Sequence, residues 1–168
     1  GSRFYAMVLF MCRTGCRTSE VAGLQWDDID LERRKARIHR GVVRGRVTDT
    51  TKSGKERYID LTPALVAELR RLKIKNQSRG AWVFQGTTGC HVDIDNFRER
   101  NWYPTLEKNE LPRVRIHDLR HSYATFLIRR TKDIFYAQKQ LGHHSIQVTV
   151  DRYGHLLEED TKTRLVDV

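Results

Sequence analysis

The sequence predicts a mainly α-helical domain with a small three-stranded antiparallel sheet near its N-terminal third, an α+β fold. Most apolar residues recur with helical spacing, whereas parts of residues 36–61 alternate as short strands do. The 168 residues suit one domain, which buries about two-thirds of the surface of its unfolded chain. Because 39% of the residues are hydrophobic and 31% are charged, a disordered chain is excluded. No apolar run approaches the roughly 18 residues of a membrane span, so we expect no membrane association.

Two helices are expected before the sheet. Residues 4–12 are nearly all apolar and predict a buried helix that ends at Thr14-Gly15. Thr18 has a side chain typical of helix caps and is expected to start a second, short helix. The core face of that helix is expected to hold three apolar residues, Val21, Leu24 and Trp26.

The sheet is expected after a turn-rich segment at residues 27–31. Alternating and β-branched residues predict three strands, at 36–39, around 42–47 and at 57–61. Ser53-Gly54 marks the tip of a hairpin.

Later helices are expected to begin at recognisable signals. Thr62-Pro63 places a hydroxyl cap before a proline at the first helical position, which predicts a helix to about Lys75. Three more helices are expected after the capping residues Asp93, Asp133 and Ser145. Another helix runs from Ile116, with an apolar face made by Leu119, Tyr123, Phe126 and Leu127.

The composition indicates a polyanionic partner. The net charge is +10, and 22 of the 31 basic residues are arginine, whose guanidinium binds phosphate oxygens in a bidentate manner. On composition alone, a nucleic-acid surface and an ordinary basic surface are equally open. The three cysteines, Cys12, Cys16 and Cys90, form no CxxC pair and are expected to be reduced, as in a cytoplasmic protein.

Two segments combine groups that can handle a phosphodiester. Arg17 lies at a predicted helix start, where backbone N–H groups and the helix dipole favour an anion. His117 and Arg120 are three positions apart, so on a helix they share a face. An imidazole and a guanidinium on one face can bind a phosphate while one of them also moves a proton. Each pattern alone is also typical of an ordinary polar surface.

A nucleophile and an acid are suggested by two further segments. Tyr153 follows His143 by ten positions, and a phenol can attack phosphorus if its proton is accepted. A tyrosine in a helix is by itself more typical of packing. Lys52, in the predicted hairpin, can protonate a leaving oxygen, and Lys55 is an alternative for that role.

A zinc site is the alternative reading of one helix. His117 and His121 are four positions apart, as in the HExxH zinc helix. Asp118 is shorter than the usual glutamate, however, and no third ligand follows at a recognisable spacing. We therefore expect no metal and no cofactor.

Taken together, these segments resemble the catalytic domain of the tyrosine site-specific recombinases, the phage integrase family. That family carries an arginine in a T-G-x-R-x-S-E segment, a hairpin lysine, H-x-x-R, L-G-H and a later tyrosine. All five occur here in the same order between Thr14 and His155. The resemblance implies the tyrosine-recombinase catalytic-domain fold and an enzyme that breaks and rejoins DNA for recombination or integration of a mobile element.

The resemblance also implies roles for the candidate catalytic residues. Arg17 and Arg120 would hold the non-bridging oxygens of the scissile phosphate, and His143 would hydrogen-bond to it. His117 would assist proton transfer at Tyr153, the nucleophile, which would form a 3′-phosphotyrosyl intermediate. Such a bond conserves the energy of the broken phosphodiester, so religation needs no ATP. Two arginines and two imidazoles can neutralise the phosphate oxygens without a metal.

Supporting roles are implied for the remaining residues of these motifs. Lys52 would protonate the 5′ oxygen of the leaving strand. Glu20 is expected to orient Arg17 or neighbouring polar groups without contacting the phosphate itself. His121, His144 and His155 are expected to support the site or the fold.

The resemblance further implies how the domain is organised and what it binds. Residues 3–168 are expected to be a single catalytic domain, with residues 1–2 a tag remnant and the family's N-terminal DNA-clamping domain missing. The partner would be a double-stranded recombination site, bound by a homotetramer with exchanged C-terminal tails in the nucleoid, while the isolated domain would be a monomer. The tail residues are expected either to pack on a neighbouring protomer or, in the isolated domain, to cover its own core; they are Leu156, Leu157, Leu165 and Val166.

Three other functions stay open at this point. A chromosome-dimer resolvase and a type IB topoisomerase-like enzyme use the same chemistry. A non-catalytic DNA-binding module would share only the fold, and the complete set of catalytic residue types counts against it.

Overall fold

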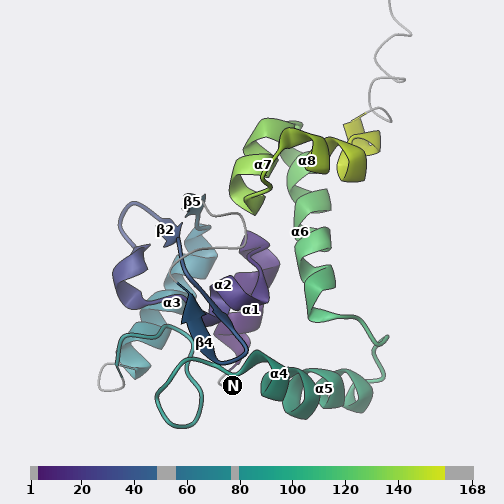
Figure 1. The fold of residues 1–168 in the computed structure, drawn as a ribbon. Coiled ribbons are helices and arrows are strands. Elements are labelled where there is room, and N and C mark those ends of the chain that lie inside the picture. Colours follow the sequence, from purple (N-terminus) through teal and green to yellow (C-terminus); the bar gives the residue numbers. More distant parts are fainter. Residues whose placement is uncertain (1–3, 49–55, 77–79, 158–168) are drawn as a thin grey trace, which may run out of the picture.

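A computed structural model describes residues 4–48, 56–76 and 80–157, which are mostly helical with two small antiparallel sheets (Figure 1). This confirms the predicted fold class. The helices of the first half are α1 (Tyr5–Thr14), α2 (Thr18–Ala22), the short 3₁₀ turn η1 (Trp26–Asp28) and α3 (Pro63–Lys75). Those of the second half are α4 (Ile94–Phe97), the π-helical turn η2 (Arg98–Trp102), α5 (Tyr103–Lys108), α6 (Ile116–Thr131), α7 (Ile134–Leu141) and α8 (Ile146–Tyr153).

The strands differ in part from the prediction. The three-stranded sheet has the order β1-β2-β5, formed by Ile29–Asp30, Lys35–Ile38 and Arg57–Asp60. Its first strand therefore comes from the segment predicted as a turn. A separate hairpin joins β3 (Gly41–Val43) to β4 (Arg46–Thr48). The predicted tip at Ser53-Gly54 lies outside the described residues.

The turn between β3 and β4 explains why this segment pairs with itself. Its two central residues, Arg44 and Gly45, both have positive φ, at 50° and 74°. A two-residue turn with positive φ at both positions matches the twist of the strands on either side. The chain therefore reverses direction directly after Val43. The valines around 42–47 thus form their own hairpin instead of the middle strand of the larger sheet.

Most helix starts follow the predicted caps. The side chains of Thr62, Asp93 and Asp133 each accept a hydrogen bond from the backbone N–H three residues later. Ser145 precedes α8 but makes no such side-chain bond. No described helix is long and apolar enough to cross a membrane.

The start of α2 corrects one prediction. The residue that caps it is Arg17 and not Thr18, because the Glu20 carboxylate reaches back to accept the Arg17 backbone N–H over 2.8 Å. The cap is therefore built from two residues that the sequence had suggested for chemistry.

Two apolar clusters make up the core. The first joins α1, α2 and α3 to the larger sheet, around fully buried residues such as Phe10, Ile59 and Leu65. The second lies between the C-terminal half of α6, α7 and α8, around Ile128 and Leu141. Its buried residues include Leu156, with Leu157 packed against it, as expected for the start of the tail. Leu165 and Val166 lie outside the described residues.

Helix α6 connects the two clusters. It runs beside α1 from the α5 end of the molecule to α7 and α8 (Figure 1). Where the clusters meet, residues 14–20 face residues 140–143, and we call this junction the seam. Phe126 departs from the predicted apolar face of α6, since it is 55% exposed.

Candidate active site

Arg120 ties the two sides of the seam together from α6. Its Nη1 donates to the carbonyl oxygen of Gly15 and its Nη2 to that of Leu141, each over 2.7 Å. The residue is 5% exposed. Burial, followed by the nearby charge of Arg17, lowers the pKa of Arg120 to about 10, so the group is still a cation at neutral pH.

Arg17 bridges the same seam closer to solvent. Its Nη1 donates to Glu20 Oε1 over 3.0 Å, and its Nη2 donates to the Gly142 carbonyl oxygen over 3.4 Å. Its side chain is 21% exposed, the most open of the arginines at the seam. An anion that approaches the seam therefore meets the guanidinium of Arg17.

Arg57 of β5 completes the group and was not predicted from the sequence. Its Nη1 and Nη2 each lie 2.8 Å from one carboxylate oxygen of Glu20, and its Nε donates to the Gln140 carbonyl oxygen over 3.0 Å. A signal was present, because Arg57 shares a strand face with buried Ile59. A charge on the apolar face of a strand indicates a buried ion pair.

Glu20 is the carboxylate that these guanidinium groups share. Its side chain is 1% exposed, and burial alone would raise its pKa. Hydrogen bonds from Arg57 and Arg17 outweigh burial and hold the pKa of Glu20 below its usual value. With one anion against the charges of Arg17, Arg57 and Arg120, the seam carries an excess of positive charge.

His143 lies at the same junction, on the turn that follows α7. Its Nδ1 lies 2.8 Å from Thr149 Oγ1 of α8. Burial, and then the charges of Arg120 and Arg17, lowers the pKa of His143 to about 4, so its imidazole is neutral at pH 7. When Nδ1 accepts the Thr149 hydroxyl proton, Nε2 carries a hydrogen and can donate to an anion. A cavity of about 220 Å³ lies beside His143 and is lined in part by Arg57 and Gly142.

Tyr153 lies at the end of α8 and contacts α6. Its phenol oxygen is 2.7 Å from Nδ1 of His121, and the residue is 5% exposed. Burial raises the pKa of Tyr153, so the phenol is protonated at neutral pH. Burial, followed by the charge of Arg152, lowers the pKa of His121, so its neutral ring can accept the phenol proton.

His117, the residue implied for proton transfer at Tyr153, lies one helical turn before the imidazole that contacts the phenol. In the described structure the phenol of Tyr153 bonds to His121, one helical turn further along α6. His117 packs its ring edge-on against His121, with ring centroids 5.0 Å apart.

No group of three metal-ligating side chains occurs among the described residues.

The other predicted residues take no part in these contacts. His144 and His155 are exposed, the first beside His143 and the second after α8. Lys52 and Lys55 lie outside the described residues. The seam thus brings together Arg17, Glu20, Arg120 and His143, with Arg57 added, while His121 joins Tyr153 next to it.

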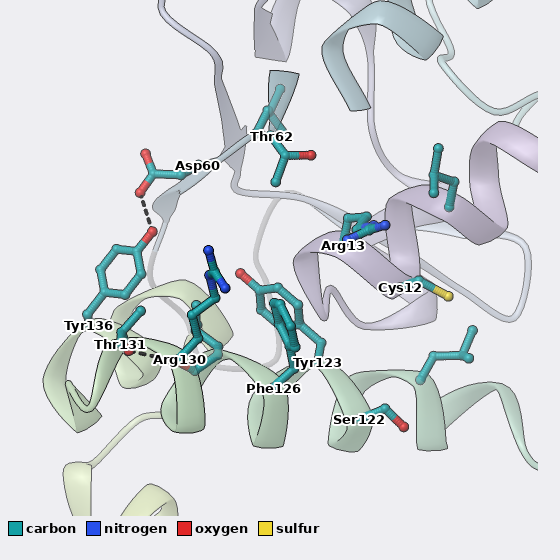
Figure 2. Close-up of a pocket in the computed structure, with 14 residues that line it drawn as sticks. Cys12, Arg13, Asp60, Thr62, Ser122, Tyr123, Phe126, Arg130, Thr131 and Tyr136 are labelled. Carbon is teal, nitrogen blue, oxygen red and sulfur yellow. Dashed lines mark hydrogen bonds between the residues drawn. The ribbon is translucent and has the colours of Figure 1, made fainter. Parts of the chain in front are cut away.

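A larger groove lies beside the site and is mostly apolar. It has a volume of about 600 Å³ and runs between α1, α6 and the end of β5. Figure 2 shows Tyr123, Phe126 and Arg130 projecting from α6 into it, opposite Arg13 and Thr62. At one end, the Tyr136 hydroxyl donates to the Asp60 carboxylate over 2.8 Å. None of the candidate catalytic residues that the structure describes lines this groove.

The sequence matches known proteins along its length. Residues 1–160 match the model of the Phage integrase family. A tyrosine recombinase XerC-like protein of Caldanaerobacter subterraneus subsp. tengcongensis is 26% identical, over 99% of this chain and 49% of its own length. The ICEBs1 integrase of Bacillus subtilis is 29% identical, over 89% and 44%. Tyrosine recombinase XerC of Neisseria meningitidis is 30% identical, over 88% and 45%. The chain spans about half the length of these curated relatives.

The fold matches solved structures as well. The Tn1549 transposon integrase, in complex with a circular intermediate DNA, has a TM-score of 0.82 and 21% identity, covering 97% of this chain and 59% of that one. The XerA recombinase has a TM-score of 0.78 and 24% identity, covering 99% and 59%. At these identities the likeness concerns the fold alone, and it confirms the predicted recombinase catalytic-domain fold.

Proposed function

The chain belongs to the phage integrase family, and from this membership we propose that it breaks and rejoins DNA strands at a recombination site, without metal or ATP. The observation that carries the proposal is the excess positive charge at the seam, where Arg17 and Arg120 lie near neutral His143. Phosphoryl transfer depends mainly on neutralising the equatorial oxygens of the phosphate, which two guanidinium groups and an imidazole can do.

In the proposed cleavage step, the phenol oxygen of Tyr153 attacks the scissile phosphorus and the bond to the 5′ oxygen breaks. The phenol proton passes to His121, whose Nδ1 is 2.7 Å away. The departing 5′ oxygen takes a proton from Lys52. Attack by a 5′-hydroxyl on the 3′-phosphotyrosyl bond reverses the step and releases the tyrosine, and a hydroxyl from another strand gives strand exchange.

The test uses a pool of nicked duplexes with randomised half-sites, so no target sequence needs to be known. Cleavage beside the nick releases a short oligonucleotide, and the covalent protein–DNA adduct then accumulates. We expect the unaltered chain to form adducts that survive denaturation, and Tyr153→Phe to form none while it still binds DNA. Tyr5→Phe is the matched control, because Tyr5 is 56% exposed on α1. Adducts formed by Tyr153→Phe would refute the assignment of the nucleophile.

Two conditions test the partner and the chemistry. EDTA is expected to leave adduct formation unchanged, and a strict metal requirement would contradict the proposed mechanism. DNA affinity is expected to fall steeply with salt, because phosphate contacts release counterions. An affinity that does not change with salt would count against a DNA substrate.

For the biological role, we propose integration or excision of a mobile element, with a chromosome-dimer resolvase as the second candidate. The similarity to the ICEBs1 integrase supports the first, and the similarity to the XerC proteins supports the second. Sequencing the recovered adducts separates them. A preferred sequence that matches the ends of a mobile element supports an integrase, and one that matches a single chromosomal site supports a resolvase. Relaxation of supercoiled plasmid without any site preference would favour a topoisomerase.

We also propose that the protein acts in the nucleoid as a homotetramer on DNA, with the C-terminal tail of one copy bound by the next. The groove between α1 and α6 is the surface proposed for the tail, because Phe126 is 55% exposed there and the tail carries apolar Leu165 and Val166. Removing residues 159–168 is then expected to prevent tetramers on DNA in analytical ultracentrifugation. Tetramers that persist would contradict tail exchange.

A further inference from the structure

We propose that Arg57 is a positioning residue of the active site, which fixes the Glu20 carboxylate and the C-terminal end of α7 relative to each other. Glu20 in turn orients Arg17, and the end of α7 leads directly to His143. The inference rests on the proposed function, since these are the groups that would meet the scissile phosphate.

Among the described residues, the guanidinium of Arg57 bonds to segments that carry the site, and its Nη2 also lies 3.9 Å from Cys16 Sγ, next to Arg17. It forms two bonds of 2.8 Å with Glu20 and one of 3.0 Å with the Gln140 carbonyl oxygen. Its side chain is 9% exposed. Because a planar guanidinium matches a carboxylate with two parallel bonds, Glu20 cannot rotate without breaking both.

Glu20 transmits this constraint to Arg17. The oxygen Oε1 accepts from Arg17 Nη1 over 3.0 Å, and Oε2 accepts from the Arg17 backbone N–H over 2.8 Å. Each of these oxygens also accepts from Arg57. The carboxylate therefore holds the side chain and the backbone of Arg17 in one orientation, and that orientation depends on Arg57.

The turn before His143 is held by direct packing. Gly142 has a φ of +67°, and a Cβ at this position would lie 2.8 Å from Cδ, Nε and Cζ of Arg57. The side chain of Arg57 thus lies against the backbone of Gly142, whose carbonyl oxygen faces Arg17 Nη2 at 3.4 Å. Arg57 and Arg17 enclose the residue that precedes His143.

Arg57→Lys tests the inference, because lysine keeps the charge but cannot form the two-bond contact. We expect the rate of adduct formation to fall by about 10- to 100-fold, as for other groups that position a catalytic residue. DNA affinity and its salt dependence should stay unchanged, because Arg57 bonds to protein acceptors. If Arg57 instead contacted a phosphate, Arg57→Gln, which removes the charge, would lower the affinity and reduce the salt slope by about 1.

A substrate with a methylphosphonate at the scissile position separates positioning from a loss of folding. This group lacks one negative oxygen, so the reaction depends less on correctly placed guanidinium groups. The loss of rate in Arg57→Lys should therefore shrink on this substrate. An equal loss on both substrates would overturn the inference. The matched control is Arg70→Lys, because Arg70 of α3 forms an exposed ion pair with Glu32. This variant should react as the unaltered chain does.

A measurement without DNA separates this inference from the proposed function. In ¹⁵N NMR, the Arg17 Nε–H should give a resolved signal that collapses to the averaged arginine position in Arg57→Lys but not in Arg70→Lys. An Arg17 signal that is unchanged by Arg57→Lys, or already averaged in the unaltered chain, would refute positioning. A resolved, Arg57-dependent signal in a chain that forms no adduct would instead refute the proposed function alone. If Arg57→Lys does not fold, Arg57→Gln, which keeps an amide donor for Glu20 but cannot form the two-bond contact, should give the same NMR result.

Discussion

The phenol oxygen of Tyr153 lies 2.7 Å from Nδ1 of His121, although His117 is the residue to which the family motif assigns proton transfer at the tyrosine. Burial raises the pKa of Tyr153, and burial with the charge of Arg152 lowers that of His121. A protonated phenol thus faces a neutral imidazole. This arrangement makes His121 the first acceptor of the proton that must leave during attack.

We predict that His121→Gln slows adduct formation by about 10²- to 10⁴-fold at pH 7, the usual contribution of a general base. His117→Gln should have a smaller effect, because His117 contacts the His121 ring and not the phenol. The check is the rate of adduct formation for both variants on the same nicked substrate.

The pH profile adds a sharper distinction between the two imidazoles. The unaltered chain should reach a plateau at a pH below the usual histidine pKa, because the pKa of His121 is lowered. In His121→Gln the phenol must ionise by itself, so the rate should keep rising with pH towards the raised pKa of Tyr153. A larger loss in His117→Gln than in His121→Gln would contradict this assignment and favour the role that the motif implies.

We predict that Arg120→Lys lowers the free energy of unfolding as well as abolishing adduct formation. A lysine cannot donate to the carbonyl oxygens of Gly15 and Leu141 in the same geometry, and a buried acceptor without a partner costs about 1–3 kcal/mol. Urea unfolding measures the loss. Arg70→Lys, whose partner Glu32 is exposed, should change stability by less than about 0.5 kcal/mol. Equal stability of the two variants would mean that Arg120 does not hold the seam together.

Local signals in the sequence predicted most of the helices, while α5 was not predicted and features that depend on packing were not predictable. The cap at Thr62 and the stop at Gly142 depend on nearby residues alone. The strand at Ile29–Asp30 forms only because Lys35–Ile38 returns beside it, and such pairing leaves no local signal.

The active site shows the same division. The motifs identify the residue types and their order, because the chemistry requires them. Which imidazole of α6 faces Tyr153 depends on how α8 packs, since His117 and His121 lie one turn apart on the same helix. Arg57 has no place in the motifs, because its role depends on a contact with Glu20 across 37 positions of the chain.

We predict that the domain loses stability as the pH falls from about 6.5 to 4. The pKa of His143 is lowered from 6.5 to about 4 in the folded state, first by burial and then by Arg120 and Arg17. Within this window the unfolded chain binds a proton that the native chain does not, so the free energy of unfolding decreases with decreasing pH. The lowered pKa values of His117 and His121 act in the same direction.

Urea unfolding between pH 7 and 4.5 measures this dependence, and His143→Gln identifies the contribution of one group. Glutamine does not titrate, so the decrease across the window should be smaller in the variant than in the unaltered chain. An identical decrease in both would show that the charge of His143 is not what opposes folding in acid.

We predict that Gly15→Ala is far more destabilising than Gly45→Ala, although both glycines have positive φ. A left-handed conformation costs a residue with a Cβ about 1–2 kcal/mol, which applies to both positions. At Gly15 the new Cβ would also lie 2.5 Å from Tyr123 Cδ1, and forcing such contacts in a core costs a further 1–3 kcal/mol or so. At Gly45 nothing lies within 4 Å.

Because the Gly15 carbonyl accepts the Arg120 bond, Gly15→Ala should also slow adduct formation, whereas Gly45→Ala should not. Thermal and urea unfolding measure the loss in free energy of unfolding for both variants. Equal losses would contradict the prediction and mean that α6 can move away from the seam at little cost.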